Sequence, residues 1–179
     1  LGKNTHLVMN ITDIDDKIIN RAKENQTDWR DVARINEDSI WNAMRKLNVN
    51  YPNHIIRVSE VLPEIIQYIQ KIIDNGFAYV VSDGSVYFDS QAYENAGYEF
   101  NRADDYCEDI QPDLRSGLSA SVSTANGEEQ NETHLNSKKN IADFALWKGR
   151  SDSDIGFEAE FVYNDAKMRC YGRPGWHIE

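Results

Sequence analysis

Residues 6–25 read HLVMNITDIDDKIINRAKEN, and this stretch decides the fold. Residues 6–12 form a short apolar run with β-branched members, which is typical of a buried strand. After the acidic residues that follow, Ile14, Ile18 and Ala22 recur at the spacing of a helix. A strand that leads straight into a helix is typical of α/β folds, in which ligands bind at the carboxyl ends of the strands.

Two further helices are predicted downstream from apolar residues that recur every three to four positions. The first covers about residues 28–47, with Thr27 as its N-cap, although the polar Asn36 interrupts its apolar stripe. The second covers about residues 60–75, with Ser59 as its N-cap. Its broad apolar face predicts that it is well buried.

The apolar spacing then changes to every second residue. Asp83-Gly84 separates two such runs, residues 77–81 and 85–89, and this pattern is a strong hairpin signal. From residue 111 to residue 139 the sequence is rich in Ser, Asn and Glu and poor in apolar residues, so we predict a flexible loop there.

The composition argues against several classes of function. The 179 residues carry 19 basic and 30 acidic side chains, and the net charge of −11 disfavours a phosphate-binding surface. No stretch approaches the roughly 20 apolar residues that span a bilayer, so we expect no membrane partner. Cys107 and Cys170 do not form a disulfide scaffold, which indicates a reducing, cytoplasmic setting. The sequence contains no zinc, phosphate-loop or hydrolase motif.

Three features carry candidate chemistry, and each also has a purely structural interpretation. Asp13, Asp15 and Asp16 fit either a magnesium or acid–base site or the charged start of a helix, and we favour the second. Thr12 lies at a predicted strand end, where it either faces a ligand crevice or only makes the turn. Trp176, in a glycine-rich segment, either packs within a loop or forms the wall of a small-molecule pocket.

Two segments considered together identify a family. Residues 10–19, NITDIDDKII, and residues 172–179, GRPGWHIE, resemble paired blocks of cysteinyl-tRNA synthetases. Residues 75–80, 84–89 and 143–148 lie between them in the order seen in that family. The resemblance covers nearly the whole chain. It implies a class I aminoacyl-tRNA synthetase, a ligase that activates cysteine with ATP and transfers it to the cysteine tRNA.

The resemblance also implies a fold and a division into segments. The expected fold class is α/β, part of a Rossmann-like class I catalytic domain with an α+β connective-peptide insert. We assign residues 1–76 to the catalytic domain and residues 77–165 to the insert, with its flexible loop near 111–139. Residues 166–179 then return to the catalytic domain.

The family's substrate site transfers to this sequence at two positions. By resemblance, Thr12 lines the amino-acid pocket and Trp176 forms its wall. In the family a zinc ion binds the substrate thiolate, and such a metal separates cysteine from serine better than pocket shape does. Cys107 and Cys170 match no zinc ligand, and the next ligand would be a Cys directly after Glu179. We therefore expect no metal ligand, no catalytic residue and no bound cofactor within this chain.

The family's adenylate motifs, H-I-G-H and K-M-S-K-S, are absent. We therefore expect the chain to be an internal fragment of a cytoplasmic-type synthetase. A rival hypothesis is a non-catalytic module that binds a protein through its helices, or tRNA through a basic patch. The patch residues would be Lys138, Lys139, Lys148 and Arg150. The sequence gives no indication of the oligomeric state.

Residues 1–179 alone are predicted to be inactive in a pyrophosphate-exchange assay with cysteine and ATP. The reason is that groups needed for ATP binding and for charge stabilisation in the transition state are not among these residues. Cysteine-dependent exchange above background would contradict the prediction.

Overall fold

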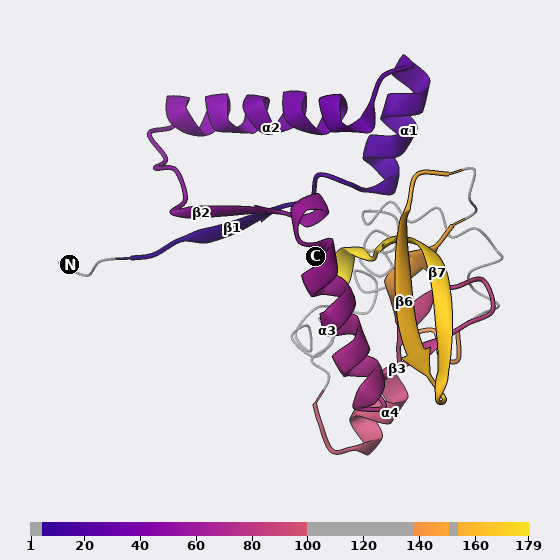
Figure 1. The fold of residues 1–179 in the computed structure, drawn as a ribbon. Coiled ribbons are helices and arrows are strands. Elements are labelled where there is room, and N and C mark those ends of the chain that lie inside the picture. Colours follow the sequence, from indigo (N-terminus) through magenta and orange to yellow (C-terminus); the bar gives the residue numbers. More distant parts are fainter. Residues whose placement is uncertain (1–4, 100–137, 151–153) are drawn as a thin grey trace, which may run out of the picture.

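The computed structural model describes residues 5–99, 138–150 and 154–179 and contains helices and two β-sheets (Figure 1). This mixture agrees with the predicted α/β class. Cys107 and the predicted loop up to residue 137 lie outside the described residues. Within the ranges described, no helix is long and apolar enough to cross a membrane.

The two sheets differ in size and strand direction. The smaller sheet pairs β1 (Val8–Ile11) with β2 (His54–Arg57) in parallel. The larger sheet is antiparallel throughout, and its strand order is β3 (Ala78–Val80), β4 (Val86–Phe88), β5 (Phe144–Gly149), β7 (Ala166–Pro174) and β6 (Phe157–Tyr163).

The small sheet belongs to a strand–helix–helix–strand unit. Its β1 confirms the predicted strand but is shorter than the predicted residues 6–12. Helices α1 (Asp16–Asn25) and α2 (Trp29–Lys46) connect it to β2, and Val8 lies opposite His54 in the parallel register. The connection returns the chain to the same end of the sheet, as parallel pairing requires.

Both helices of this unit begin at an aspartate. The Asp15 carboxylate accepts a hydrogen bond from the Lys17 N–H at 2.8 Å and caps α1. Asp28 caps α2 in the same way, through the Arg30 N–H at 2.8 Å. The prediction that Thr27 is the cap was therefore wrong by one position, because the adjacent carboxylate takes the free N–H.

Polar residues in the middle of α2 stabilise the helix and its attachment. The Asn36 amide donates to the Val32 carbonyl at 2.8 Å, so this residue does not end the helix. Glu37 accepts hydrogen bonds from Arg57 at 2.8 and 2.9 Å and from the Trp41 indole at 3.0 Å. The bidentate pair between Glu37 and Arg57 joins α2 to β2.

The segment before the third helix differs from the prediction. Ser59 lies in a short 3-10 helix, η1 (Val58–Glu60), and hydrogen-bonds to Asp13 instead of capping a helix. Helix α3 (Leu62–Asp74) follows Val61, which provides no side-chain cap. The predicted cap was wrong because a distant carboxylate competes successfully for the Ser59 side chain.

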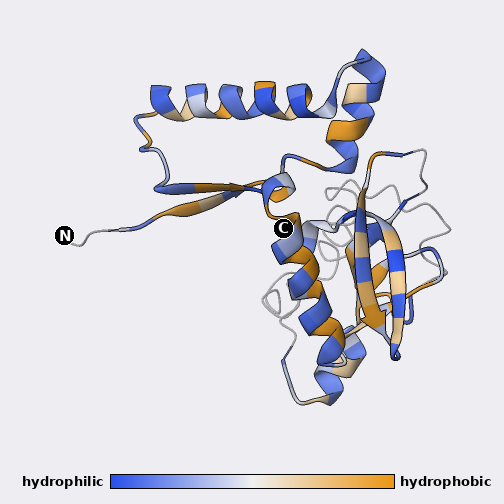
Figure 2. Ribbon diagram, in the orientation of Figure 1, coloured by the Kyte–Doolittle hydropathy of each residue, from blue (hydrophilic) through white to orange (hydrophobic). Residues whose placement is uncertain are grey.

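Helix α3 packs beside the edge strand β6 (Figure 1). Ile65, Ile69 and Ile73 are buried along one stripe of the helix, as the sequence predicted, and Figure 2 shows hydrophobic and hydrophilic bands alternating along it. The Gln70 amide accepts from the Val162 N–H at 2.8 Å and donates to the Val162 carbonyl at 3.0 Å. One side chain thus satisfies both backbone groups of a residue in β6.

The predicted hairpin is confirmed as β3 and β4. Gly84 has φ of +81°, which the turn requires, and the Val81 N–H donates to the Ser85 carbonyl at 2.9 Å. A short helix, α4 (Ser90–Asn95), follows the hairpin.

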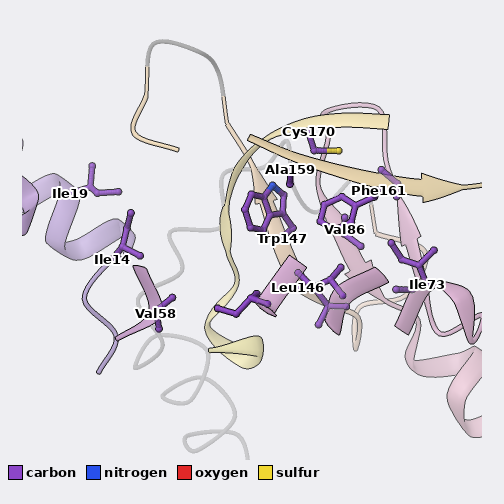
Figure 3. Packing of buried hydrophobic residues seen from close by; sticks show 14 of the residues in the cluster. Ile14, Ile19, Val58, Ile73, Val86, Leu146, Trp147, Ala159, Phe161 and Cys170 are labelled. Atoms are coloured by element: carbon purple, nitrogen blue, oxygen red, sulfur yellow. The ribbon is translucent and has the colours of Figure 1, made fainter. Parts of the chain in front are cut away.

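The hydrophobic core contains large side chains from the five-stranded sheet (Figure 3). Trp147 and Phe161 are fully buried, and their rings meet edge to face with centroids 6.0 Å apart. Leu146, Val86 and Cys170 belong to the same cluster. The cluster continues to residues of α1 and η1, so one core connects these two helices to the large sheet.

A buried polar network lies at the start of β5. The Asp143 carboxylate accepts from the Tyr79 hydroxyl at 2.8 Å, the Ser90 hydroxyl at 2.8 Å, and the N–H groups of Ser90 and Asn140, both at 3.0 Å. Burial raises the pKa of Tyr79, and Asp143 adds to the rise although the Lys139 N–H opposes it. The network ties the segment before β5 to β3 and α4.

Asp143→Ala is predicted to lower the free energy of unfolding by about 3 kcal/mol, because it leaves several buried donors without an acceptor. Glu158→Ala is the matched control, since Glu158 is an exposed acidic residue in β6 and its loss should change stability by less than about 0.5 kcal/mol. Denaturant unfolding measures both. Equal stability of the two variants would contradict the assigned role of Asp143.

Candidate functional site

Thr12 lies directly after β1, in the turn that leads to α1. The turn is fixed on one side by Asp13, which is buried and accepts hydrogen bonds from the Ser59 N–H at 2.9 Å and from the Ser59 hydroxyl. The position of Thr12 at the carboxyl end of a parallel strand is as predicted. Side chains at such strand ends face ligands in α/β folds.

Trp176 begins a short 3-10 helix, η3 (Trp176–Ile178), that follows β7. Its side chain is 57% exposed and contacts the ring of His177, with centroids 5.5 Å apart. His177 in turn contacts Phe144, at 4.7 Å between centroids. Trp176 is therefore not packed into the core, and its ring is available to a ligand.

Glycines hold the segment before Trp176 tightly against β5. A Cβ atom on Gly172 would lie 2.2 Å from the Lys148 carbonyl oxygen, and one on Gly175 would lie 1.9 Å from the Ala145 carbonyl oxygen. Real Cβ atoms do not approach so closely, so only glycine fits at these two positions. These close contacts hold the backbone just before Trp176 against β5.

The two predicted site segments meet at Glu179. The Thr12 hydroxyl lies close enough to the Glu179 carboxylate, directly after η3, to influence its pKa. Burial raises the pKa of Glu179 to about 7, with Asp15 and Asp13 adding to the rise and Thr12 and Lys148 opposing it. The structure thus brings Thr12 to the helical turn that begins with Trp176.

The turn that contains Thr12 and the segment that contains Trp176 are therefore close to each other. A pocket between the Thr12 and Trp176 side chains stays a prediction. A surface hollow of about 400 Å³ lies elsewhere, along α2, and its lining includes Ile35 and Ala43.

The three aspartates after Thr12 have three separate structural roles. Asp13 binds Ser59, Asp15 caps α1, and Asp16 forms ion pairs with the large sheet. The favoured interpretation, the charged start of a helix, is confirmed for Asp15 and Asp16. The interactions of Asp13 and Asp16 with distant residues were not predicted.

Asp16 is the centre of an ion cluster between α1 and the large sheet. It accepts hydrogen bonds from Arg173 Nε at 2.9 Å and from Arg173 Nη2, from Arg150 Nη2 at 2.9 and 3.1 Å, and from Lys148 Nζ at 3.4 Å. Burial alone would raise the pKa of Asp16, but these cations outweigh burial and hold the pKa well below its ordinary value.

A second carboxylate completes the cluster. Asp154 pairs with Lys23 at 3.0 Å, Arg173 at 3.4 Å and Arg150 at 3.6 Å. No local motif in the sequence predicts the pair of Asp16 and Arg173, because these two residues are 157 positions apart.

The basic patch of the rival hypothesis does not form as a single surface. Lys148 and Arg150 bind Asp16, whereas Lys139 binds Asp89 at 3.0 Å. Lys138 lies over the Tyr87 ring, 5.8 Å from its centroid. Acidic partners thus compensate three of these four charges, which weighs against the tRNA-binding patch of the rival hypothesis.

The described residues do not provide a metal site. Among them, no group of three or more His, Cys, Asp or Glu side chains is placed to hold a metal ion. Cys170 is buried in the core, and its thiol pKa is raised by burial and by Asp83. These residues therefore do not fit the zinc ion that the resemblance implies.

Comparison with known proteins gives consistent matches. Residues 1–179 match a family model described as the tRNA synthetases class I (C) catalytic domain. The chain is 49% identical over 179 residues to a cysteine–tRNA ligase of Acanthamoeba polyphaga mimivirus, and 41% identical over 179 residues to a cytoplasmic cysteine–tRNA ligase of Dictyostelium discoideum. Both alignments cover the whole chain but only 32% and 24% of the relatives. The chain thus spans a third or less of the length of these relatives.

Acidification provides a test of the Asp16 cluster. The pKa of Asp16 is lower in the folded than in the unfolded chain, so its ionised form stabilises the fold above about pH 4, and this stabilisation is lost as the pH falls further. Asp16→Asn should therefore cost about 3 kcal/mol at neutral pH and progressively less from about pH 4 to pH 2. Urea unfolding at several pH values measures the difference.

The matched control is Glu160→Gln, which removes a partly exposed carboxylate paired with Lys167 at 2.9 Å. Its effect should stay below about 1 kcal/mol. An effect of Asp16→Asn that did not change with pH would refute the electrostatic role of Asp16.

Proposed function

This chain belongs to the family of class I cysteinyl-tRNA synthetase catalytic domains, and on that premise we propose that the protein ligates cysteine to its tRNA. In this proposal ATP and cysteine react to form cysteinyl-adenylate and pyrophosphate, and the cysteine tRNA then accepts the cysteine. The family match over the whole chain supports the proposal.

The close approach of the Thr12 hydroxyl to the Glu179 carboxylate is the structural observation that carries it. It joins the end of β1 to the turn that begins with Trp176, as a substrate site built from both segments requires. We infer that Thr12 lines the amino-acid pocket and that the exposed ring of Trp176 forms a wall. A rigid indole covers a large area of a small substrate at little entropic cost.

The proposal assigns the two sheets to different parts of the synthetase. The parallel pair of β1 and β2 belongs to a Rossmann-like sheet, and its exposed apolar residues Val8 and Ile56 suit a larger sheet that is covered on both faces. The five-stranded antiparallel sheet belongs to the connective-peptide insert. Because β7 pairs with β5 and β6, we place the return to the catalytic domain after Pro174 and not at residue 166.

The proposal also includes a zinc ion and a cytoplasmic location. A zinc ion would bind the substrate thiolate and so distinguish cysteine from serine. The described residues do not form its ligand set. The cytoplasmic setting rests on the cysteine usage of the sequence.

In the full-length protein, Trp176→Ala is predicted to raise the KM for cysteine about tenfold or more in pyrophosphate exchange, because it removes apolar contact with the substrate. The KM for ATP should change less than about twofold. Tyr68→Ala is the matched control, since Tyr68 of α3 is 58% exposed, like Trp176. A wild-type protein without cysteine-dependent exchange would refute the proposed function.

A further inference from the structure

Two segments that are distant in the sequence have to be held together for the proposed amino-acid site to exist. One is the turn after β1, which contains Thr12 and leads, four residues later, to Asp16, the first residue of α1. The other is the end of β7, where Arg173 precedes Trp176 by three residues. The ion pair of Asp16 and Arg173 joins these two segments beside the site.

The pair has the geometry of a fixed connection. Arg173 donates through both Nε and Nη2 to Asp16, and its side chain is only 5% exposed. Its remaining contacts are the Ile155 carbonyl and Asp154. A buried guanidinium held at several atoms has little freedom to rotate.

Contacts other than this ion pair also hold each of the two segments in place. On the Thr12 side, Asp13 binds Ser59, so the turn cannot move independently of η1. On the Trp176 side, Gly175 packs against the Ala145 carbonyl and donates its N–H to Leu146 at 2.8 Å. A change at the ion pair is therefore transmitted to the spacing between the two segments and is not absorbed by the turn or by the strand.

We propose that Asp16 is a positioning residue for the amino-acid substrate: through Arg173 it sets the separation of Thr12 and Trp176, and so determines the affinity for cysteine. The inference rests on the proposed function. Asp16 does not touch the substrate. Arg150 and Lys148 bind the same carboxylate and fix its orientation.

Pyrophosphate exchange by the full-length protein tests this role with three variants. Asp16→Asn keeps the shape of the side chain but removes its charge, and Arg173→Lys keeps the charge but loses the two-point contact. Glu160→Gln is the matched control, because it neutralises one carboxylate of an ion pair in the hairpin of β6 and β7. For each variant the KM for cysteine, the KM for ATP, kcat and the melting temperature are measured.

We expect Asp16→Asn and Arg173→Lys to raise the KM for cysteine about tenfold, with the KM for ATP within about twofold of the wild type. Glu160→Gln should change neither. This split separates positioning from stability, because a partly unfolded sample has less active enzyme and a lower apparent kcat but the same KM.

Four results would overturn the inference. A fall in kcat at unchanged KM would show that Asp16 is only structural, and an equal rise in both KM values would show general damage to the site. A cysteine KM that does not change in an active enzyme would refute the positioning role while leaving the proposed function intact. Absence of exchange in the wild type would instead refute the proposed function, and the inference with it.

Discussion

The guanidinium of Arg173 is almost completely removed from water, and it lies where α1 meets the five-stranded sheet. A buried cation of this kind is costly unless a carboxylate compensates it with well-formed hydrogen bonds. Asp16 supplies that carboxylate from the first residue of α1, and Asp154 supplies a second. The apolar core also joins α1 and η1 to the large sheet, but apolar packing is not directional. The ion cluster therefore specifies how the parallel unit sits against the large sheet.

Local backbone geometry and this long-range ion pair act together on the proposed site. The glycines of β7 allow the strand to approach β5 closely, and their contacts leave Trp176 exposed at the start of η3. The buried Asp143 network stabilises the start of β5, next to Phe144, whose ring contacts His177 of η3. The part of the sheet that carries Trp176 is therefore a rigid support, and rigid supports hold binding side chains more accurately than loops do.

The sequence predicted elements that depend on local patterns and missed contacts that depend on the tertiary fold. The hairpin at Gly84 and the apolar face of α3 follow from spacing alone, and both are confirmed. Ser59 was expected to cap a helix, but Asp13, 46 positions away, binds it instead. No local sequence pattern indicates the pairing of Asp16 with Arg173, because these residues are also far apart in the sequence. Thr12 was placed by its position at a strand end and by family resemblance, whereas Trp176 as a pocket wall depended on the resemblance.

The contact between Gln70 and Val162 occupies backbone hydrogen-bonding groups at one edge of the large sheet. β6 is an edge strand, and unpaired N–H and C=O groups on such an edge are a template for joining the strand of another molecule. The Gln70 side chain occupies both groups of Val162, so a foreign strand would have to displace it before a continuous ladder could form. A single amide on a neighbouring helix thus blocks strand addition at one position of the β6 edge.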